Sequence, residues 1–115
     1  MSVLSIAVVV PSTNHDAAVA RYRELLEVDI VAQFELPGGS LTVTVLPGIS
    51  ILSGSEETLA PVRELRASLM VDSLELTRQR LERTGWVIEG TLGAPGSLLA
   101  RDPDGAHFEF VEHTQ

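Results

Sequence analysis

The stretch GSLTVTVLPG, residues 39–48, has a counterpart in GSLLARDPDG, residues 96–105, and the two align without a gap at an offset of 57 residues. Each stretch is an apolar run that ends in a turn rich in Pro, Gly or Asp, and a further apolar run follows each turn. Two such runs joined by a short turn predict a β-hairpin. Because the pattern occurs twice, we predict that the chain contains two copies of one structural unit.

The residues before each hairpin predict the same order of elements. In the first copy we expect a strand at 5–11, a helix that turns Ala18, Tyr22, Leu25 and Leu26 inward, and strands at 29–36, 41–46 and 49–52. In the second copy we expect a strand at 65–71, a helix that turns Leu74, Thr77 and Leu81 inward, and strands at 86–92, 97–101 and 107–112. Asp72 and Glu75 predict a capping box before the second helix, and Gly85 predicts its end.

The first unit is expected at about residues 1–54 and the second at about 61–115, with a loop at 53–61 between them. Neither unit could bury its apolar sheet face alone. The whole chain, residues 1–115, is therefore predicted to be a single domain.

Composition excludes several kinds of chemistry. The chain has no cysteine and all eight of its basic residues are arginine, so disulfides, thiolate ligands and a lysine Schiff base are excluded. The net charge of −8 makes nucleic acid an unsuitable partner, since affinity for it depends on cationic groups. No apolar run is long enough to span a bilayer. The N-terminus has no basic segment before its apolar stretch, which indicates a strand, not a signal peptide, and a cytoplasmic location is expected.

Two stretches carry a resemblance to a known family. AVARYRELLEV, residues 18–28, resembles the first helix of the vicinal oxygen chelate superfamily, which includes glyoxalases, bleomycin-resistance proteins and extradiol dioxygenases. DPDGAHFEF, residues 102–110, resembles its closing turn and strand. Arg21 stands where the family usually has an aromatic residue, and Glu27 where it usually has Gly. The resemblance implies an α+β fold in which two tandem βαβββ units form an open, U-shaped mixed sheet around a cavity, with the helices outside.

The superfamily holds its metal, where it has one, on four inward side chains from the first and fourth strands of each unit. In this chain those positions correspond to Ser5, Leu52 (or Ile51), Arg66 and Glu109. Only Glu109 is a good ligand, because serine is a poor neutral donor, leucine has no lone pair and arginine keeps its proton. We therefore predict no metal and no other cofactor.

A divalent metal on His107 and Glu109 is an alternative, since these residues share one face of a strand. Two ligands do not hold a metal tightly, and the third would have to come from His15 or His113. Both of these are expected to be solvated surface residues.

Strand alternation predicts which side chains line the cavity. One face of the first, fifth and last strands is apolar, with Ile6, Val8, Val10, Leu65, Ala67, Leu69, Val71, Phe108 and Phe110, and is expected under the helices. The opposite face mixes polar and apolar groups. The candidate ligand-binding residues are accordingly Ser5, Leu52, Arg66, Ser68, Met70, His107 and Glu109.

Arg66 and Glu109 are expected to face each other. Either Arg66 binds an anion of the ligand with Glu109 orienting it or taking a proton, or the two form a structural ion pair; the sequence leaves both open. Glu109 is thus the one candidate catalytic residue. Trp86 is interpreted either as cover for the sheet edge or as a stacking surface for a flat ligand. Glu35 and Glu89 are expected to face solvent.

These observations favour a metal-independent protein of the glyoxalase/bleomycin-resistance type that binds a small organic molecule. A glyoxalase-like lyase, an isomerase or a dioxygenase with non-standard metal ligands is the first alternative. A module used only for protein interaction is the second. The apolar early strands lack the lysines that protect sheet edges, so a homodimer is expected.

Overall fold

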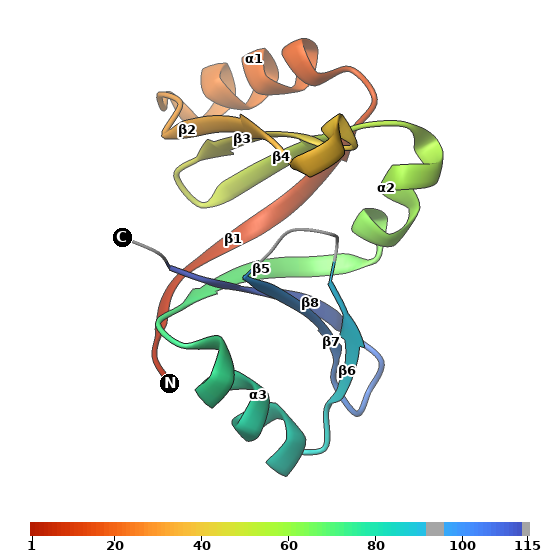
Figure 1. Ribbon diagram of the computed structural model, residues 1–115. Helices are drawn as coiled ribbons and strands as arrows, with labels where there is room; N and C mark the ends of the chain where they lie inside the picture. The colour runs from red at the N-terminus through yellow and green to blue at the C-terminus, as the bar shows by residue number, and fades with distance from the viewer. Residues whose placement is uncertain (92–95, 114–115) are drawn as a thin grey trace. The chain divides into compact units, whose positions relative to one another are not determined.

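The computed structural model describes residues 1–91 and 96–113. In chain order its elements are β1 (Val3–Ser12), α1 (His15–Leu26), β2 (Ala32–Glu35), the 3₁₀ turn η1 (Pro37–Gly39), β3 (Thr42–Leu46), β4 (Ile49–Ser53), α2 (Glu56–Arg63), β5 (Leu65–Val71), α3 (Leu74–Arg83), β6 (Val87–Gly90), β7 (Ser97–Arg101) and β8 (His107–Glu112) (Figure 1). The predicted α+β class, with a βαβββ order that occurs twice and a mixed sheet, is confirmed. β5, β7 and β8 have the predicted bounds, while the predicted strand end at residue 92 and the turn at 94–95 lie outside the described residues.

The chain forms two compact units. The N-terminal unit is Ala7–Glu64, and the C-terminal unit combines Met1–Ile6 with Leu65–Gln115. β1 therefore begins in the C-terminal unit. There the Ser2 amide donates to Asp72 Oδ1 at 2.8 Å, and the Asp72 amide donates to the Ser2 carbonyl at 3.2 Å. These bonds, with the positive N-terminus, hold the pKa of Asp72 below its usual value.

In the N-terminal unit the strand order is β2-β3-β4-β1, antiparallel except for the parallel pair β1 and β4. α1 packs on β3 and β4, where Ala18 and Val19 are buried with Leu46 and Ile51. The inward positions predicted for Leu25 and Leu26 are wrong, because both are exposed near the end of the helix. Ile51 faces α1, so its neighbour Leu52 lies on the opposite face of the sheet. This is the face expected for Leu52 when Leu52, and not Ile51, is aligned with the superfamily's metal position.

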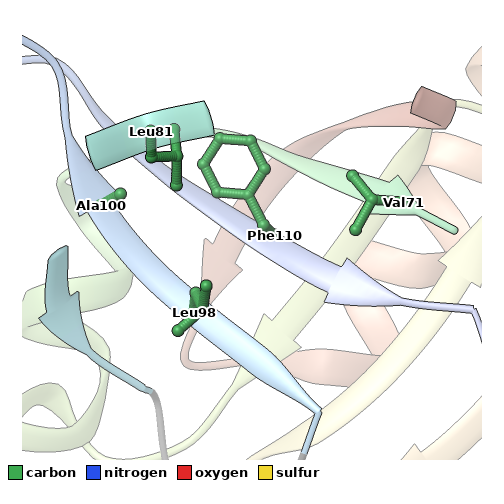
Figure 2. Close-up of a cluster of buried hydrophobic side chains, with 5 residues drawn as sticks. All are labelled: Val71, Leu81, Leu98, Ala100 and Phe110. Atoms are coloured by element: carbon green, nitrogen blue, oxygen red, sulfur yellow. The ribbon is translucent and has the colours of Figure 1, made fainter. Parts of the chain in front are cut away.

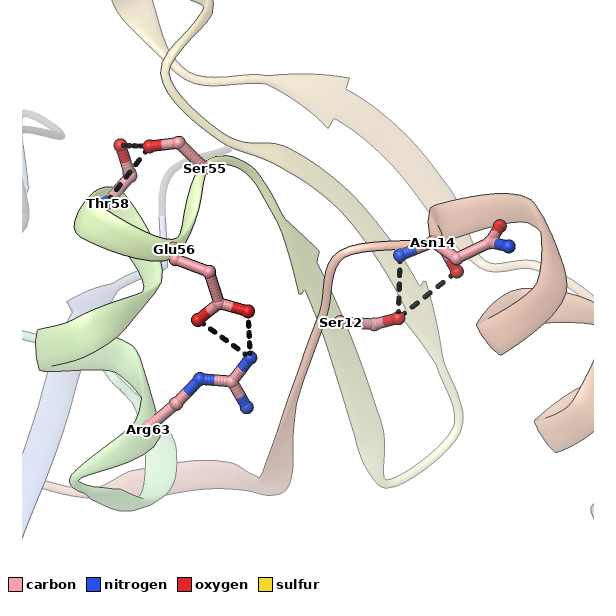
Figure 3. Close-up of polar contacts among 6 residues, drawn as sticks. All are labelled: Ser12, Asn14, Ser55, Glu56, Thr58 and Arg63. Atoms are coloured by element: carbon pink, nitrogen blue, oxygen red, sulfur yellow. Dashed lines mark hydrogen bonds and ion pairs between the residues drawn. The ribbon is translucent and has the colours of Figure 1, made fainter.

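The predicted loop at residues 53–61 is in part a helix, α2. The Ser55 side chain caps it by accepting from the Thr58 amide at 3.2 Å, and Glu56 pairs with Arg63 at 3.1 Å (Figure 3). Leu59 and Val62 are fully buried. Pro61 lies inside this helix, where burial of the apolar pair and the cap outweigh the one backbone hydrogen bond that proline removes.

In the C-terminal unit β5 runs parallel to β8, which is antiparallel to β7, and β7 is antiparallel to β6. One face of this sheet packs against α3. Its buried core consists of Val71, Leu81, Leu98, Ala100 and Phe110, and the Phe110 ring lies beside Leu81 of α3 (Figure 2). Trp86 joins this core, with its ring centroid 5.7 Å from that of Phe108 and 5.8 Å from that of Phe110. It is therefore a core residue on the helix side, which excludes the ligand-stacking interpretation.

The cap of α3 is not the predicted one. Ser73 is the N-cap, and its hydroxyl accepts a hydrogen bond from the Leu76 amide at 3.2 Å. The Asp72 carboxylate instead accepts a hydrogen bond from the Ser2 amide. Glu112 Oε1 accepts a further hydrogen bond from the Leu74 amide at 2.9 Å. The start of this helix is therefore tied to the last strand of the same unit.

The prediction that a helix covers Ile6 and Val8 is also wrong. Ile6 is 60% exposed and Val8 is 55% exposed. α1 packs mainly on β3 and β4, and α3 on β6 and β8, so Ile6 and Val8 stay largely exposed, whereas Val10 of the same face packs against the core under α1. Among the described residues, no helix is long and apolar enough to cross a membrane.

His15, expected to be a solvated residue, is part of a polar network in the N-terminal unit. Its Nδ1 lies 2.7 Å from Ser53 Oγ, and its Nε2 lies 2.7 Å from Thr44 Oγ1. Gln33 Nε2 also donates to Thr44 Oγ1, at 3.0 Å. Thr44 is completely buried and Ser53 nearly so, and the imidazole satisfies both hydroxyls while fixing the start of α1.

We predict that His15→Ala lowers the free energy of unfolding by about 1–3 kcal/mol, because it leaves two buried hydroxyls without this partner. Chemical denaturation monitored by circular dichroism measures the change. His113→Ala, at an exposed histidine, is the matched control and is expected to have no effect. Equal stability of the two variants would contradict a structural role for His15.

Candidate functional site

The face of the C-terminal sheet opposite α3 carries the polar side chains. Because Phe108, Phe110 and Leu69 pack on the α3 side, strand alternation places Ser68, His107 and Glu109 on the other face. The register supports this placement, since Ser68 is paired with Glu109 across β5 and β8. This polar face of the C-terminal unit is the candidate site.

Glu109 is the least exposed carboxyl group of this face. Its Oε1 accepts a hydrogen bond from Ser68 Oγ at 2.9 Å. Burial raises the pKa of Glu109, and the Ser68 hydrogen bond offsets part of that increase. The carboxyl group therefore holds a proton more readily than a solvated glutamate, and when protonated it can donate a hydrogen bond to a ligand oxygen.

His107 forms an ion pair with Glu89 of β6, with 3.0 Å between Nε2 and Oε1. Glu89 is exposed, as expected, and its carboxylate also contacts this imidazole. The strand register shifts between Ile88 and Gly90, so Glu89 is an extra residue in β6. Such a β-bulge re-aims a side chain, and here it accompanies a contact that reaches across β7 to β8. Local sequence gives no signal for this contact, because it depends on how the strands pair.

Arg66 does not form the expected pair with Glu109. It is exposed, and the ion pairs recorded for residues 1–91 and 96–113 do not include it. A second bulge lies here, since Leu65 is paired with His107 and Ala67 with Phe108, which leaves Arg66 as the extra residue of β5. Ser68, not Arg66, is the partner of Glu109.

The remaining predicted site residues are dispersed. Ser5 is exposed on the part of β1 that belongs to the C-terminal unit, and Met70 is half-buried on β5. Leu52 is buried in the N-terminal unit. Their role in ligand binding stays a prediction. A shallow hollow of about 450 Å³ is lined by Gln79, Glu82 and Arg83 of α3, the helix that covers the opposite sheet face, and has no part in this site.

The residues at the superfamily's metal positions do not fit a metal ion. Leu52 offers no donor, Arg66 is a cation, and Glu109 already accepts a hydrogen bond from Ser68, while burial raises its pKa. In the described part of the chain, no three His, Asp or Glu side chains gather in a way that could hold a metal. His15, one proposed third ligand, is held by Thr44 and Ser53 in the N-terminal unit.

No protein-family model and no curated protein sequence matches the chain. Solved structures do. An uncharacterized protein from Methanosarcina mazei is 31% identical, with a TM-score of 0.86, and the match covers 99% of this chain and 95% of that one. Methylmalonyl-CoA epimerase from Mycobacterium tuberculosis is 17% identical, with a TM-score of 0.73 and coverage of 98% and 90%. The Streptomyces coelicolor epimerase, solved with 2-nitronate-propionyl-CoA, is 14% identical, with a TM-score of 0.74 and coverage of 99% and 100%.

These similarities, together with the duplicated βαβββ order, define a glyoxalase-like fold. The fold is thus shared with methylmalonyl-CoA epimerase, a member of the vicinal oxygen chelate superfamily that the two sequence stretches resemble.

We predict that Glu109→Gln changes how stability depends on pH. Because the folded-state pKa of Glu109 lies above its ordinary value of 4.5, the native protein loses stability as the pH rises through that raised pKa. The glutamine variant has no such loss, so its advantage over the wild type should grow with pH and then level off. Thermal unfolding from about pH 4, below the ordinary pKa, to about pH 9 measures this difference.

Glu82→Gln, on the exposed surface of α3, is the control and should follow the wild-type curve. A constant destabilisation of Glu109→Gln at every pH would show that the carboxylate is needed in its charged form, contrary to the raised pKa.

Proposed function

We propose that the protein is a metal-independent, small-molecule-binding protein of the glyoxalase/bleomycin-resistance type. Its ligand is held on the polar face of the C-terminal sheet, where Ser68, Met70, His107 and Glu109 lie. The observation that carries the proposal is the contact of Glu109, which is expected at a metal position of the superfamily but accepts a hydrogen bond from Ser68 and has a raised pKa because of burial.

The chemistry of this face suits an oxygen-bearing organic ligand. A protonated Glu109 donates a hydrogen bond to a carbonyl or carboxyl oxygen. Glu89 fixes the Nε2 side of His107, which leaves the imidazole oriented and its other nitrogen available. Half-buried Leu99, paired with Glu109 across β7 and β8, supplies apolar surface beside them. Apolar surface with a few placed polar groups is the usual composition of a small-molecule site.

The structural likeness to methylmalonyl-CoA epimerase favours an enzyme as the second candidate function. In that case Glu109 is the candidate acid, and the metal chemistry of a lyase, isomerase or dioxygenase would need ligands other than Ser5, Leu52 and Arg66. The donor set at these positions favours ligand binding over metal chemistry. A cytoplasmic location accompanies both candidates.

We predict that the purified protein carries no stoichiometric divalent metal and that an organic molecule co-purifies with it. Elemental analysis tests the first part, and native mass spectrometry before and after mild denaturation tests the second. About one zinc, nickel, manganese or iron ion per chain would overturn metal independence. Failure of a broad thermal-shift screen to find any stabilising small molecule would favour a module used only for interaction.

A homodimer is the second part of the proposal. Leu4, Ile6 and Val8 alternate along β1 and are all about half exposed or more. Exposed apolar side chains in a row on one strand are the kind of surface that a second protein copy covers. Two-fold pairs are the commonest oligomers, and screening at physiological salt reduces the repulsion between two chains of charge −8.

We predict that the wild type is a dimer that buries well over about 1,000 Å² in total. Ile6→Glu should convert it to a monomer near 12.4 kDa in light scattering at micromolar concentration, because the change places a charge in the interface. Leu76→Glu alters an apolar residue of α3 that is 48% exposed, and serves as the control that should stay dimeric. A monomeric wild type would refute the dimer.

A further inference from the structure

Two irregularities in the C-terminal sheet lie on either side of His107. One is the bulge in β5, which makes Arg66 an extra residue between Leu65, the register partner of His107, and Ala67. The other is the bulge in β6 at Glu89, the side chain that pairs with His107. Bulges are frequent next to functional sites because they re-aim side chains. Their coincidence around one histidine singles out this position of the sheet.

Arginines occupy both strands that flank His107. Arg101 on β7 is its direct register partner, and the extra residue Arg66 on β5 lies beside the partner Leu65. In a bulge the two residues on the longer strand face one residue on the other, which places Arg66 across from His107. Three nitrogen-rich side chains therefore occupy adjacent positions across β5, β8 and β7.

Arg66 and Arg101 form no ion pair with a carboxylate in the described part of the chain. In residues 1–91 and 96–113 the recorded ion pairs of arginine are those of Arg23 with Asp29 and Arg63 with Glu56. Arg66 and Arg101 are exposed and belong to none of them, although acidic residues outnumber basic ones by sixteen to eight in this chain. Their guanidinium donors are open to an anion from solution.

His107, the third side chain of the cluster, already contacts a carboxylate. Glu89 Oε1 lies 3.0 Å from His107 Nε2, and both side chains are partly exposed. This contact demonstrates that a carboxylate fits against the imidazole edge. It also supplies a negative charge beside the two arginines, which a bound anion would have to tolerate or displace.

We propose that Arg66, Arg101 and His107 form an anion subsite that binds a carboxylate group of the ligand, in competition with Glu89. This inference deepens the proposed function and rests on it, since it names the chemical class of the ligand. The guanidinium groups pair with the ligand carboxylate through charge-assisted hydrogen bonds. Glu89 occupies the imidazole edge in the absence of ligand. Removal of its charge therefore strengthens binding, whereas removal of either guanidinium weakens it.

Titration with three probes of one size class tests the subsite. Succinate carries carboxylates, succinamide is its neutral counterpart, and inorganic phosphate is a different oxyanion. Binding to the wild-type protein is followed by isothermal calorimetry and by the ¹H–¹⁵N amide shifts of β7 and β8. The variants are Arg66→Gln, Arg101→Gln and Glu89→Gln, with Arg78→Gln and Glu82→Gln on α3 as charge-matched controls.

We expect succinate to bind more tightly than succinamide. Arg66→Gln and Arg101→Gln should each weaken succinate binding by about threefold to tenfold, the loss expected for one partly solvated charged hydrogen bond. Glu89→Gln should strengthen it by a factor of about two to five. The α3 controls should leave it unchanged. All five positions are exposed, and thermal unfolding confirms that each variant is folded.

Several outcomes would overturn the subsite. One is equal weakening by Arg78→Gln, which would show that only the net charge matters. Another is weaker succinate binding in Glu89→Gln, and a third is phosphate binding that exceeds succinate binding with the same dependence on both arginines. If succinamide binds as tightly as succinate and no arginine variant matters, the small-molecule site stands and the anion subsite alone is wrong. If neither organic probe nor any molecule of the thermal-shift screen binds, both proposals fail.

Discussion

Burial of the apolar face of β8 against α3 is the constraint on which the candidate site depends. Phe110 is nearly inaccessible and lies with Leu81 in the core of the C-terminal unit. Since side chains of a strand alternate between the two faces, this burial places His107 and Glu109 on the opposite face. A slip of one residue would exchange the two sets, placing the carboxyl group in the core. The phenylalanines therefore position the polar residues as firmly as any polar contact does.

The two bulges decide how that polar face is used. Ser68, not Arg66, is the register partner of Glu109, and Arg66 is an exposed extra residue of β5. The bulge in β6 accompanies the contact between Glu89 and His107. A buried carboxyl bonded to a neutral hydroxyl has a raised pKa, whereas an arginine would have lowered it. The pairing of β5 with β8 thus determines which side chain acts on the pKa of Glu109.

A shared fold does not imply shared chemistry in this case. The backbone superposes on methylmalonyl-CoA epimerases with TM-scores of 0.73 and 0.74, but at 17% and 14% identity such likeness speaks for the fold alone. At the four positions that the resemblance assigns to metal ligands, this chain has one carboxyl group, and burial raises the pKa of that group.

Sequence alone determined the repeated order of elements, the strand ends of β5, β7 and β8, and the face on which Ser68, His107 and Glu109 lie. These follow from hydrophobic periodicity and turn residues, which act over a few neighbours. The residues that sequence reasoning misplaced have partners distant in the chain. α2 forms despite Pro61 because Leu59 and Val62 are buried. Asp72 does not cap α3, because its carboxylate accepts a hydrogen bond from the Ser2 amide.

The tertiary structure alone decided the contacts of His15, Glu89 and Glu109. His15 binds Thr44 and Ser53 because α1 is docked on β3 and β4, and no local pattern encodes that docking. The partners of Glu89 and Glu109 depend on strand register, which is fixed by how whole strands pair and where a bulge shifts them. Local periodicity selects the face of a side chain, whereas the pairing of strands distant in sequence selects its neighbour.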